Sequence, residues 1–372
     1  MSRFFRAFGL VCLAGVGACA PGDGQKEYGL GEKAYELHNL KKAEKYFQKS
    51  VEINAANVNA HIMLSRVRLD LGEIASANKA IETAASLADG EDFDILMTKG
   101  QIAYHMKNYD SAMSLFKKVA ANYKLDRITR SKALSSLGIV QMTCDRRDEA
   151  RVSFMMALNL DRKNNPSAFY HLGLLYRDAF DYPEAAQEQF EMFVRLQAAP
   201  RERVNKVQRD ILPLLRDSIM RATSQIPNVS RRDSQASAAL LAKAEAQYAK
   251  KKYRDALKYY RESLFNDPLS YPAQLGIAKV LDRDTTLAGQ KAAFKAYLAA
   301  CKLKPNSTST HLHAAAMAMR LSQPMTAARL YSRALATNPV KRDAIDGLMR
   351  AYEMIPGNQT LVRIYKAYRS SL

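Results

Sequence analysis

The chain has 372 residues, 48% of them hydrophobic, and 56 Lys and Arg against 37 Asp and Glu give it a formal net charge of +19. That length fits one long repeat array or a few globular domains. Four cysteines are too few for a disulfide-stabilised scaffold, so the fold must be held together by its packed core.

The N-terminus, MSRFFRAFGLVCLAGVGACA, has the features of a secretory signal peptide. Arg3 and Arg6 precede an apolar run over residues 7–16. That run is too short to cross a bilayer, which takes about 20 apolar residues. Cleavage after Ala20 would satisfy the A-x-A rule for ordinary secretion.

A second cleavage site competes with the first, because VGAC at residues 16–19 resembles a bacterial lipobox. The resemblance implies a lipoprotein signal peptide over 1–18, a lipid anchor (palmitate among its acyl chains) on Cys19 and a tether over 19–24. Position 20 is Ala and not Asp, which implies the outer membrane, with the protein facing the periplasm. We favour this lipoprotein over plain secretion and over an uncleaved cytosolic start.

Beyond the tether, one pattern recurs: a small residue followed four positions later by an aromatic residue. It is clearest in KKAEKYFQKS (41–50), DSAMSLFKKV (110–119) and RDALKYYRES (254–263). The anchoring alanines are spaced by 34 to 38 residues, apart from one gap of 70. They are Ala43, Ala77, Ala112, Ala150, Ala186, Ala256, Ala293 and Ala327.

This pattern resembles the tetratricopeptide repeat, whose period is 34 residues. The resemblance implies an all-α, right-handed α-solenoid of about eight helical hairpins, in which a small residue on each first helix crosses the second helix. It divides the chain into five repeats over 25–197, a non-repeat helical insert over 198–236, three repeats over 237–339 and a capping helix pair over 340–372. The crossing residues would be Gly31, Ser65, Gly100, Gly138, Gly173, Ala244, Ala278 and Ala315.

The insert keeps apolar residues at helical spacing but lacks the small–aromatic signature. Pro213 should kink this helix and Pro227 should end it, because proline cannot continue the backbone hydrogen bonding. In the later repeats, Pro268, Pro305 and Pro339 should end each second helix for the same reason.

The resemblance also implies a ligand groove along the first helix of each repeat, suited to an extended or helical peptide of a protein partner. The Lys and Asn clamp of chaperone-binding relatives is absent, because Tyr28, Glu32 and Met63 occupy its places. The groove residues would be Tyr28, Tyr35, Arg66, Met97, Gln101, Tyr104, His105, Met142, Tyr170 and Arg177.

Positive charge is concentrated late in the chain. Residues 19–130 hold 16 basic and 15 acidic residues, whereas residues 131–372 hold 38 and 22. This asymmetry favours an anionic partner, an envelope polymer or lipid, as a rival to the peptide groove. No nucleic-acid-binding motif is present, so nucleic acid is not expected. The candidate anion-binding residues are Arg231, Arg232, Lys250, Lys251 and Lys252.

No catalytic motif stands out, and no cofactor or metal is expected. His311 and His313 are two residues apart, so a helix points them to different faces. The sequence therefore predicts a non-catalytic, lipid-anchored interaction scaffold of the bacterial envelope, serving outer-membrane, pilus or secretion assembly. The anionic-polymer binder and a cytosolic adaptor remain the alternatives, and nothing indicates an oligomeric state.

Overall fold

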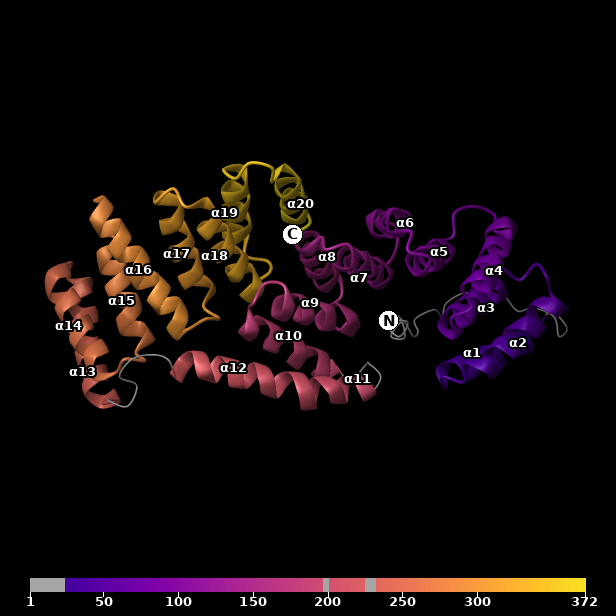
Figure 1. The fold of residues 1–372 in the computed structure, drawn as a ribbon, viewed down its shortest axis with the longest axis horizontal. Helices are drawn as coiled ribbons and strands as arrows, with labels where there is room; N and C mark the ends of the chain where they lie inside the picture. Colours follow the sequence, from indigo (N-terminus) through magenta and orange to yellow (C-terminus); the bar gives the residue numbers. More distant parts are fainter. Residues whose placement is uncertain (1–23, 197–200, 225–231) are drawn as a thin grey trace. The chain divides into compact units, whose positions relative to one another are not determined.

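The computed structural model describes residues 24–196, 201–224 and 232–372. Within those ranges every regular element is a helix (Figure 1). The chain divides into two compact units, which are described separately: unit 1 is Met1–His171 with Leu196–Val204, and unit 2 is Leu172–Arg195 with Asn205–Leu372.

Unit 1 is a series of helix pairs joined by short turns. We call the first helix of each pair helix A and the second helix B. The pairs are α1 (Gln25–Glu36) with α2 (Leu40–Ile53), α3 (Val58–Leu71) with α4 (Ile74–Leu87), α5 (Phe93–His105) with α6 (Tyr109–Ala121), and α7 (Arg127–Thr143) with α8 (Arg147–Leu160).

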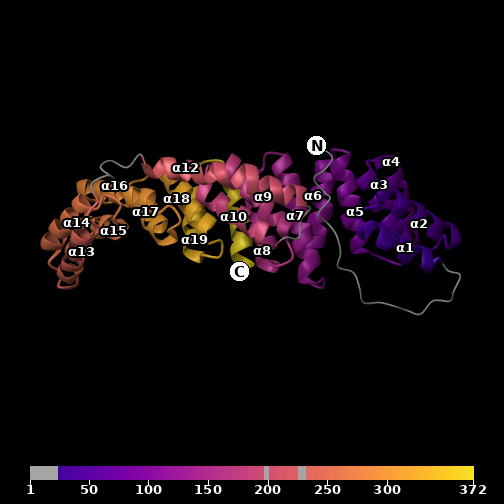
Figure 2. The ribbon, with the colours of Figure 1, turned by 90° about the horizontal axis from the view of Figure 1, so that it is seen from below.

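Unit 2 continues the same pattern, and Figure 2 shows its pairs from a second side. Helix α9 (Pro166–Asp178) starts in unit 1 and enters unit 2. The predicted all-α solenoid of hairpins is confirmed for the described residues. The pairs are α9 with α10 (Pro183–Leu196), α13 (Ser234–Ala249) with α14 (Tyr253–Asn266), α15 (Tyr271–Leu281) with α16 (Leu287–Leu303), α17 (Thr308–Arg320) with α18 (Pro324–Thr337), and α19 (Arg342–Glu353) with α20 (Gln359–Ser370).

Local sequence explains where these helices begin and end. The side chains of Asn39 and Asn57 accept hydrogen bonds from backbone N–H groups three residues on, a cap worth about 1 kcal/mol. As predicted, α14, α16 and α18 each end two residues before a proline, at Pro268, Pro305 and Pro339.

In unit 1 the small–aromatic pattern closes the hairpins α1–α2, α5–α6 and α7–α8, whereas in α3–α4 the buried Ile81 takes the place of the aromatic residue. Phe116 and Phe154 on helices B are fully buried. A Cβ added at Gly100 or Gly138 would lie 2.7 Å from the Phe ring of the same hairpin. Only a residue without a side chain fits there, so these predicted crossing residues are confirmed.

In unit 2 the α9–α10 hairpin keeps the pattern of unit 1, because a Cβ added at Gly173 would lie 3.0 Å from the ring of Phe190. From α13 on, the ring on helix B is a tyrosine, and at Tyr260 and Tyr331 it reaches the next hairpin. Within the α13–α14 hairpin, Ala244 is the small residue at which α13 crosses the helix that carries the buried Tyr260. A Cβ added at Gly276, on the next helix α15, would clash with that same ring. Tyr331 on α18 meets Gly347 on α19 in the same way. These rings therefore pack between consecutive hairpins as well as within one.

The insert is helical, as predicted, with a widened turn in place of a simple kink. Residues Arg201–Lys206 (α11), Val207–Ile211 (a π-helical turn, η1) and Leu212–Ser224 (α12) follow without a break. The backbone N–H of Leu212 donates to the carbonyl of Val207, five residues back. Pro213 has no N–H to give, and the π turn lies directly before it. Pro227 lies outside the described residues.

Unit 2 also contains a contact between distant hairpins, α10 and α18 (Figures 1 and 2). The Tyr182 hydroxyl donates to the backbone carbonyl of Arg329, 147 residues along the chain. The Arg333 guanidinium bonds Glu184 at 3.0 Å and lies 5.1 Å from the centre of the Tyr182 ring. This long-range contact closes unit 2 by joining α10 to α18, and it therefore groups α10 with the later repeats. The arrays predicted over 25–197 and 237–339 remain a prediction as folding units.

Candidate functional site

Helices A of unit 1 are braced to one another at their last turns. The Tyr35 hydroxyl donates to a carboxylate oxygen of Asp70 at 2.8 Å, and the hydroxyls of Tyr104 and Thr143 lie 3.2 Å apart. Burial and the neighbouring Asp70 raise the pKa of Tyr35, so its hydroxyl keeps its proton. Each pair links residues 35 or 39 positions apart, about one repeat.

Unit 2 has equivalent pairs with a different chemistry. The Arg283 guanidinium donates to the Tyr248 hydroxyl at 3.3 Å, and Arg320 donates to Asp282 at 2.6 Å. The separations are 35 and 38 residues. We call the set Tyr35–Asp70, Tyr104–Thr143, Tyr248–Arg283 and Asp282–Arg320 the ladder.

Several predicted groove residues use part of their side-chain surface in contacts with neighbouring helices. Arg66 bonds Asp94 and Thr98 on the next helix A. Met97 is buried in the core, 8% exposed. The Tyr28 ring packs edge-on against Phe47 at 5.6 Å. These side chains join neighbouring helices, and for Met97 this structural role accounts for nearly all of its surface.

Gln101, His105 and Met142 keep a half-exposed surface on helices A. The His105 ring meets Tyr104 edge-on at 5.6 Å, and its partial burial lowers its pKa, which favours the neutral imidazole. Polar, aromatic and thioether groups therefore border the ladder of unit 1, and each can contact a partner without unpacking the core.

Tyr170 is only 8% exposed, because Arg203 of α11 lies 5.2 Å from its ring centre within unit 1. The neighbouring His171 is buried and stacks on Phe154 at 5.9 Å. Burial and the charge of Arg203 lower the pKa of His171 to about 3. The insert covers this part of α9, so Tyr170 is not accessible to a partner in this structure.

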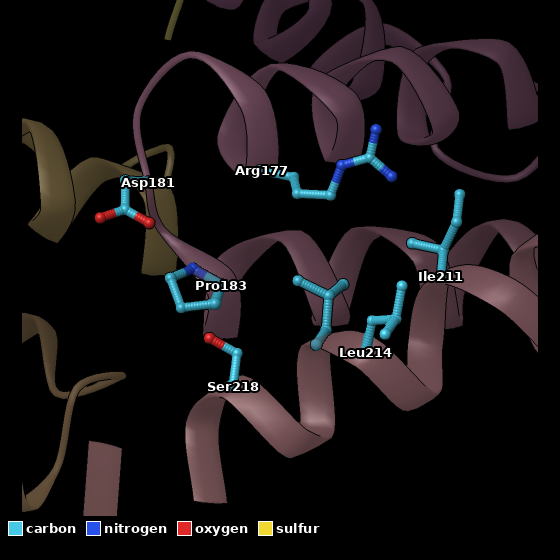
Figure 3. Close-up of a pocket in the computed structure, with 7 residues that line it drawn as sticks. Arg177, Asp181, Pro183, Ile211, Leu214 and Ser218 are labelled. Carbon is cyan, nitrogen blue, oxygen red and sulfur yellow. The ribbon is translucent and has the colours of Figure 1, made fainter. Parts of the chain in front are cut away.

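Arg177 lies in unit 2 and bonds its neighbour Asp178. It also lines a cavity of about 220 Å³ between the α9–α10 hairpin and the insert (Figure 3). In Figure 3 the side chain of Arg177 lies on the opposite side of the cavity from Leu214 and Ile211 of the insert. The lining residues are Arg177, Asp181, Pro183, Ile211, Leu214, Leu215 and Ser218.

The predicted anion-binding residues do not form one patch. Arg231 lies outside the described residues, and Arg232 is bonded to Asp267 at 2.9 Å. The lysines at 250–252 are exposed in the turn at the other end of α13, a helix of 16 residues and therefore about 24 Å long. Within the described ranges none of the three lysines forms an ion pair.

Sequence reasoning missed Arg283, which is a member of the ladder. Arg283 lies beside the turn that carries those three lysines. Its guanidinium lies 4.4 Å from the ring centre of Tyr253 and 5.5 Å from that of Tyr248. The sequence did contain a signal for this contact, because Tyr248 and Arg283 are 35 residues apart, which is one repeat length plus one position. Only the tertiary structure shows that the two side chains meet.

The described residues lack the features of a metal site and of a membrane-spanning helix. That part of the chain contains no group of three His, Cys, Asp or Glu side chains arranged to hold a metal ion. No helix among the described residues is long and apolar enough to cross a membrane. Cys144 and Cys301 are free thiols, and burial raises the pKa of Cys301 to about 12. Cys19 lies outside the described residues.

The tetratricopeptide-repeat family model matches residues 62–126, 228–271 and 241–308. Comparison with curated protein sequences gives no match.

Similar solved structures include PilF of Pseudomonas aeruginosa, with 18% identity, a TM-score of 0.41, and 69% of this chain and 97% of that chain covered. TTC0263, a tetratricopeptide-repeat protein of Thermus thermophilus, has 19% identity and a TM-score of 0.43 over 50% and 98%. YrrB, described as a repeat protein with an unusual peptide-binding site, has 17% identity and a TM-score of 0.35 over 53% and 93%. With TM-scores below 0.5, these likenesses say nothing about the partner of this chain.

Proposed function

We propose that this tetratricopeptide-repeat protein is a non-catalytic scaffold that binds a segment of a partner protein on the helix-A surface of unit 1. The observation that carries the proposal is the braced row of helices A, with Gln101, His105 and Met142 half-exposed beside the ladder. A surface whose side chains are already held in place loses little conformational entropy on binding.

The proposed site is narrower than the set of residues predicted from sequence. Met97 and Tyr170 are buried, and Arg66 is engaged with Asp94 and Thr98. The partner would contact mainly the ring edges of Tyr28 and Tyr104 and the half-exposed Gln101, His105 and Met142. Aromatic side chains of this kind often dominate interface energy, at about 2 kcal/mol or more each.

The test introduces arginine at two groove positions, Gln101→Arg with Met142→Arg. The matched control, Ser114→Arg with Asn159→Arg, adds the same charge at exposed positions on helices B of the same hairpins. Partner proteins are captured from the native cell on tagged full-length protein and washed at about 0.1 M and about 1 M salt, where the Debye length falls from about 10 to 3 Å.

We expect a partner that survives both washes with the parent and the control and is lost from the groove variant. If the groove variant retains the same partner, the proposed surface is wrong. If retention is abolished by salt alone for every variant, binding is electrostatic, and the anionic-partner alternative replaces the peptide groove.

We further propose that the scaffold is anchored by lipid on Cys19 in the cell envelope, where it would serve outer-membrane, pilus or secretion assembly. The support is the lipobox-like VGAC ahead of a short tether. Cys19→Ala should release the protein from membranes or leave its leader attached, as seen by fractionation and gel migration. A variant that behaves like the parent would contradict the lipid anchor and leave plain secretion and the cytosolic adaptor as the alternatives.

A further inference from the structure

The α13–α14 turn and the end of α15 together place a guanidinium between two aromatic rings. Arg283 lies 4.4 Å from the ring centre of Tyr253 and 5.5 Å from that of Tyr248, and it donates to the Tyr248 hydroxyl at 3.3 Å. The two rings also pack edge-on against each other, with centres 5.5 Å apart. An exposed arginine is thus held in one orientation by three separate contacts.

No carboxylate forms an ion pair with this guanidinium within the described residues, although the charge of the adjacent Asp282 also acts on it. Asp282 pairs with Arg320 at 2.6 Å, and Asp284 accepts the backbone N–H of Thr286. Arg283 itself is exposed, so its remaining N–H groups face solvent. The hydrogen bond to Tyr248 raises the pKa of Arg283, which keeps it charged.

Three more cations lie on the same turn. Lys250, Lys251 and Lys252 connect Tyr248 on α13 to Tyr253 on α14, and all three are exposed. Because the two tyrosines that hold Arg283 flank the lysine run, the lysines and the guanidinium belong to one surface. We call Tyr248, Lys250–Lys252, Tyr253 and Arg283 the cationic cradle.

We propose that the cationic cradle binds an acidic peptide segment of a partner protein, with Arg283 taking a carboxylate through its paired N–H groups. A planar guanidinium in a fixed orientation matches the two oxygens of a carboxylate, whereas a lysine acts as a point charge. The tyrosine rings offer apolar edges to the peptide on either side of that carboxylate. The cradle goes beyond the proposed function, because it lies in unit 2 and not on the helix-A surface of unit 1.

The fixed orientation is also what favours a peptide over a lipid surface. Attraction to an anionic membrane depends on the number of basic residues near it and needs no particular geometry. Exchange of arginine for lysine therefore separates the two occupants, because it keeps the charge and removes the planar pair of donors.

The test measures binding of the full-length chain to a fluorescein-labelled Glu–Gly repeat peptide and to vesicles of phosphatidylcholine with phosphatidylglycerol. Variants are Arg283→Ala, Arg283→Lys and a matched control, Arg261→Lys, at an exposed arginine on α14. A Gln–Gly peptide serves as the uncharged probe. Circular dichroism confirms that each variant is folded, which is expected because Arg283 is exposed.

For the acidic peptide we expect Arg283→Ala to weaken binding about tenfold or more and Arg283→Lys to weaken it severalfold, since a charge-assisted hydrogen bond contributes about 1.5–3 kcal/mol. Arg261→Lys should bind like the parent, and the Gln–Gly peptide should not bind. The proposal is overturned if Arg283→Lys binds the acidic peptide as tightly as the parent, or if only the vesicles bind. Neither outcome affects the groove of unit 1, which the captured partner tests separately.

Discussion

The two units place the aromatic residue of helix B differently. In unit 1 a phenylalanine presses on a glycine of its own hairpin, as Phe154 does on Gly138. In the hairpins of unit 2 from α13 on, the crossing residue is alanine and the ring is a tyrosine. For Tyr260 and Tyr331 a glycine stands on the next helix A, as Gly276 does against Tyr260. One repeat pattern therefore strengthens the hairpin itself where glycine faces phenylalanine, and the joint between hairpins at Tyr260 and Tyr331.

The ladder differs between the units in the same systematic way. In unit 1 the tyrosine hydroxyl meets an acceptor, as Tyr35 does at Asp70, whereas in unit 2 Tyr248 meets the guanidinium of Arg283. The same backbone arrangement presents oxygen atoms in one unit and cations in the other. These are the two surfaces on which we propose that two different partners bind.

The largest expected effect concerns the glycines under the rings. Gly276→Ala and Gly138→Ala should each cost about 1–3 kcal/mol of unfolding free energy, because overpacking forces side chains and backbone to move. Gly276→Ala should cost more, since its new Cβ would lie closer to a ring. Urea unfolding measures both.

Gly29→Ala is the control for this pair, because nothing lies within 4 Å of a Cβ there. It should stabilise α1 by about 0.5–1 kcal/mol through helix propensity. Equal effects of all three substitutions would break the comparison between the units.

The second effect is a pH dependence that is largest in unit 1, at His171, although burial also lowers the pKa of His311 in unit 2. The pKa of His171 is about 3 when folded and about 6.5 when unfolded, so between these values the unfolded state binds more protons. Stability should therefore fall as pH drops below 6.5, by about 2 kcal/mol from pH 6.5 to 5. His171→Phe should remove most of this slope in unfolding measured at both pH values, and an unchanged slope would contradict the assignment.

The third effect tests the contact that closes unit 2. Arg333→Ala should cost about 1–2 kcal/mol, because it removes a charged hydrogen bond and leaves the half-buried Glu184 without that partner. Arg363→Ala, at an exposed arginine on α20, should cost little. A double-mutant cycle with Glu184→Ala should be non-additive, and additive costs would mean that the two side chains act independently.

The smallest effect is a gain in stability. Lys251 has a φ of 60° in the α13–α14 turn, whereas the α3–α4 turn of unit 1 uses Gly72 at a φ of 85°. Lys251→Gly should therefore stabilise the chain by about 1 kcal/mol by relieving left-handed strain. Gly72→Lys should destabilise it by a similar amount, as thermal unfolding can show. A loss of stability from Lys251→Gly would mean that the lysine makes a compensating contact.

The hairpins could be predicted from sequence because each depends on residues close together in the chain, such as Ala150 and Phe154 one helical turn apart. The contacts of the ladder were not predicted. Tyr35 and Tyr104 were assigned to a ligand groove, although each also bonds the next helix A. Position within a repeat indicates which face a side chain lies on, but it does not say whether a neighbour or a partner occupies that face.

Two features were outside the reach of sequence patterns. The covering of Tyr170 by Arg203 depends on the path of the insert, which carries no repeat signature. The contact of Tyr182 with Arg329 joins residues 147 positions apart. Neither follows from local spacing, because each depends on how the chain returns after leaving the regular stack.

That return contact has a consequence for the order in which the protein is made. A stack of local hairpins can assemble as each one leaves the ribosome, but α10 must wait for α18, 147 residues later. At about 5–20 residues per second, the wait is roughly 7–30 s. During that interval Tyr182 and Glu184 lack the partners that they have in the finished unit. The nascent chain therefore has a period in which a chaperone could hold α10, and a ribosome pausing within α12–α17 would lengthen it.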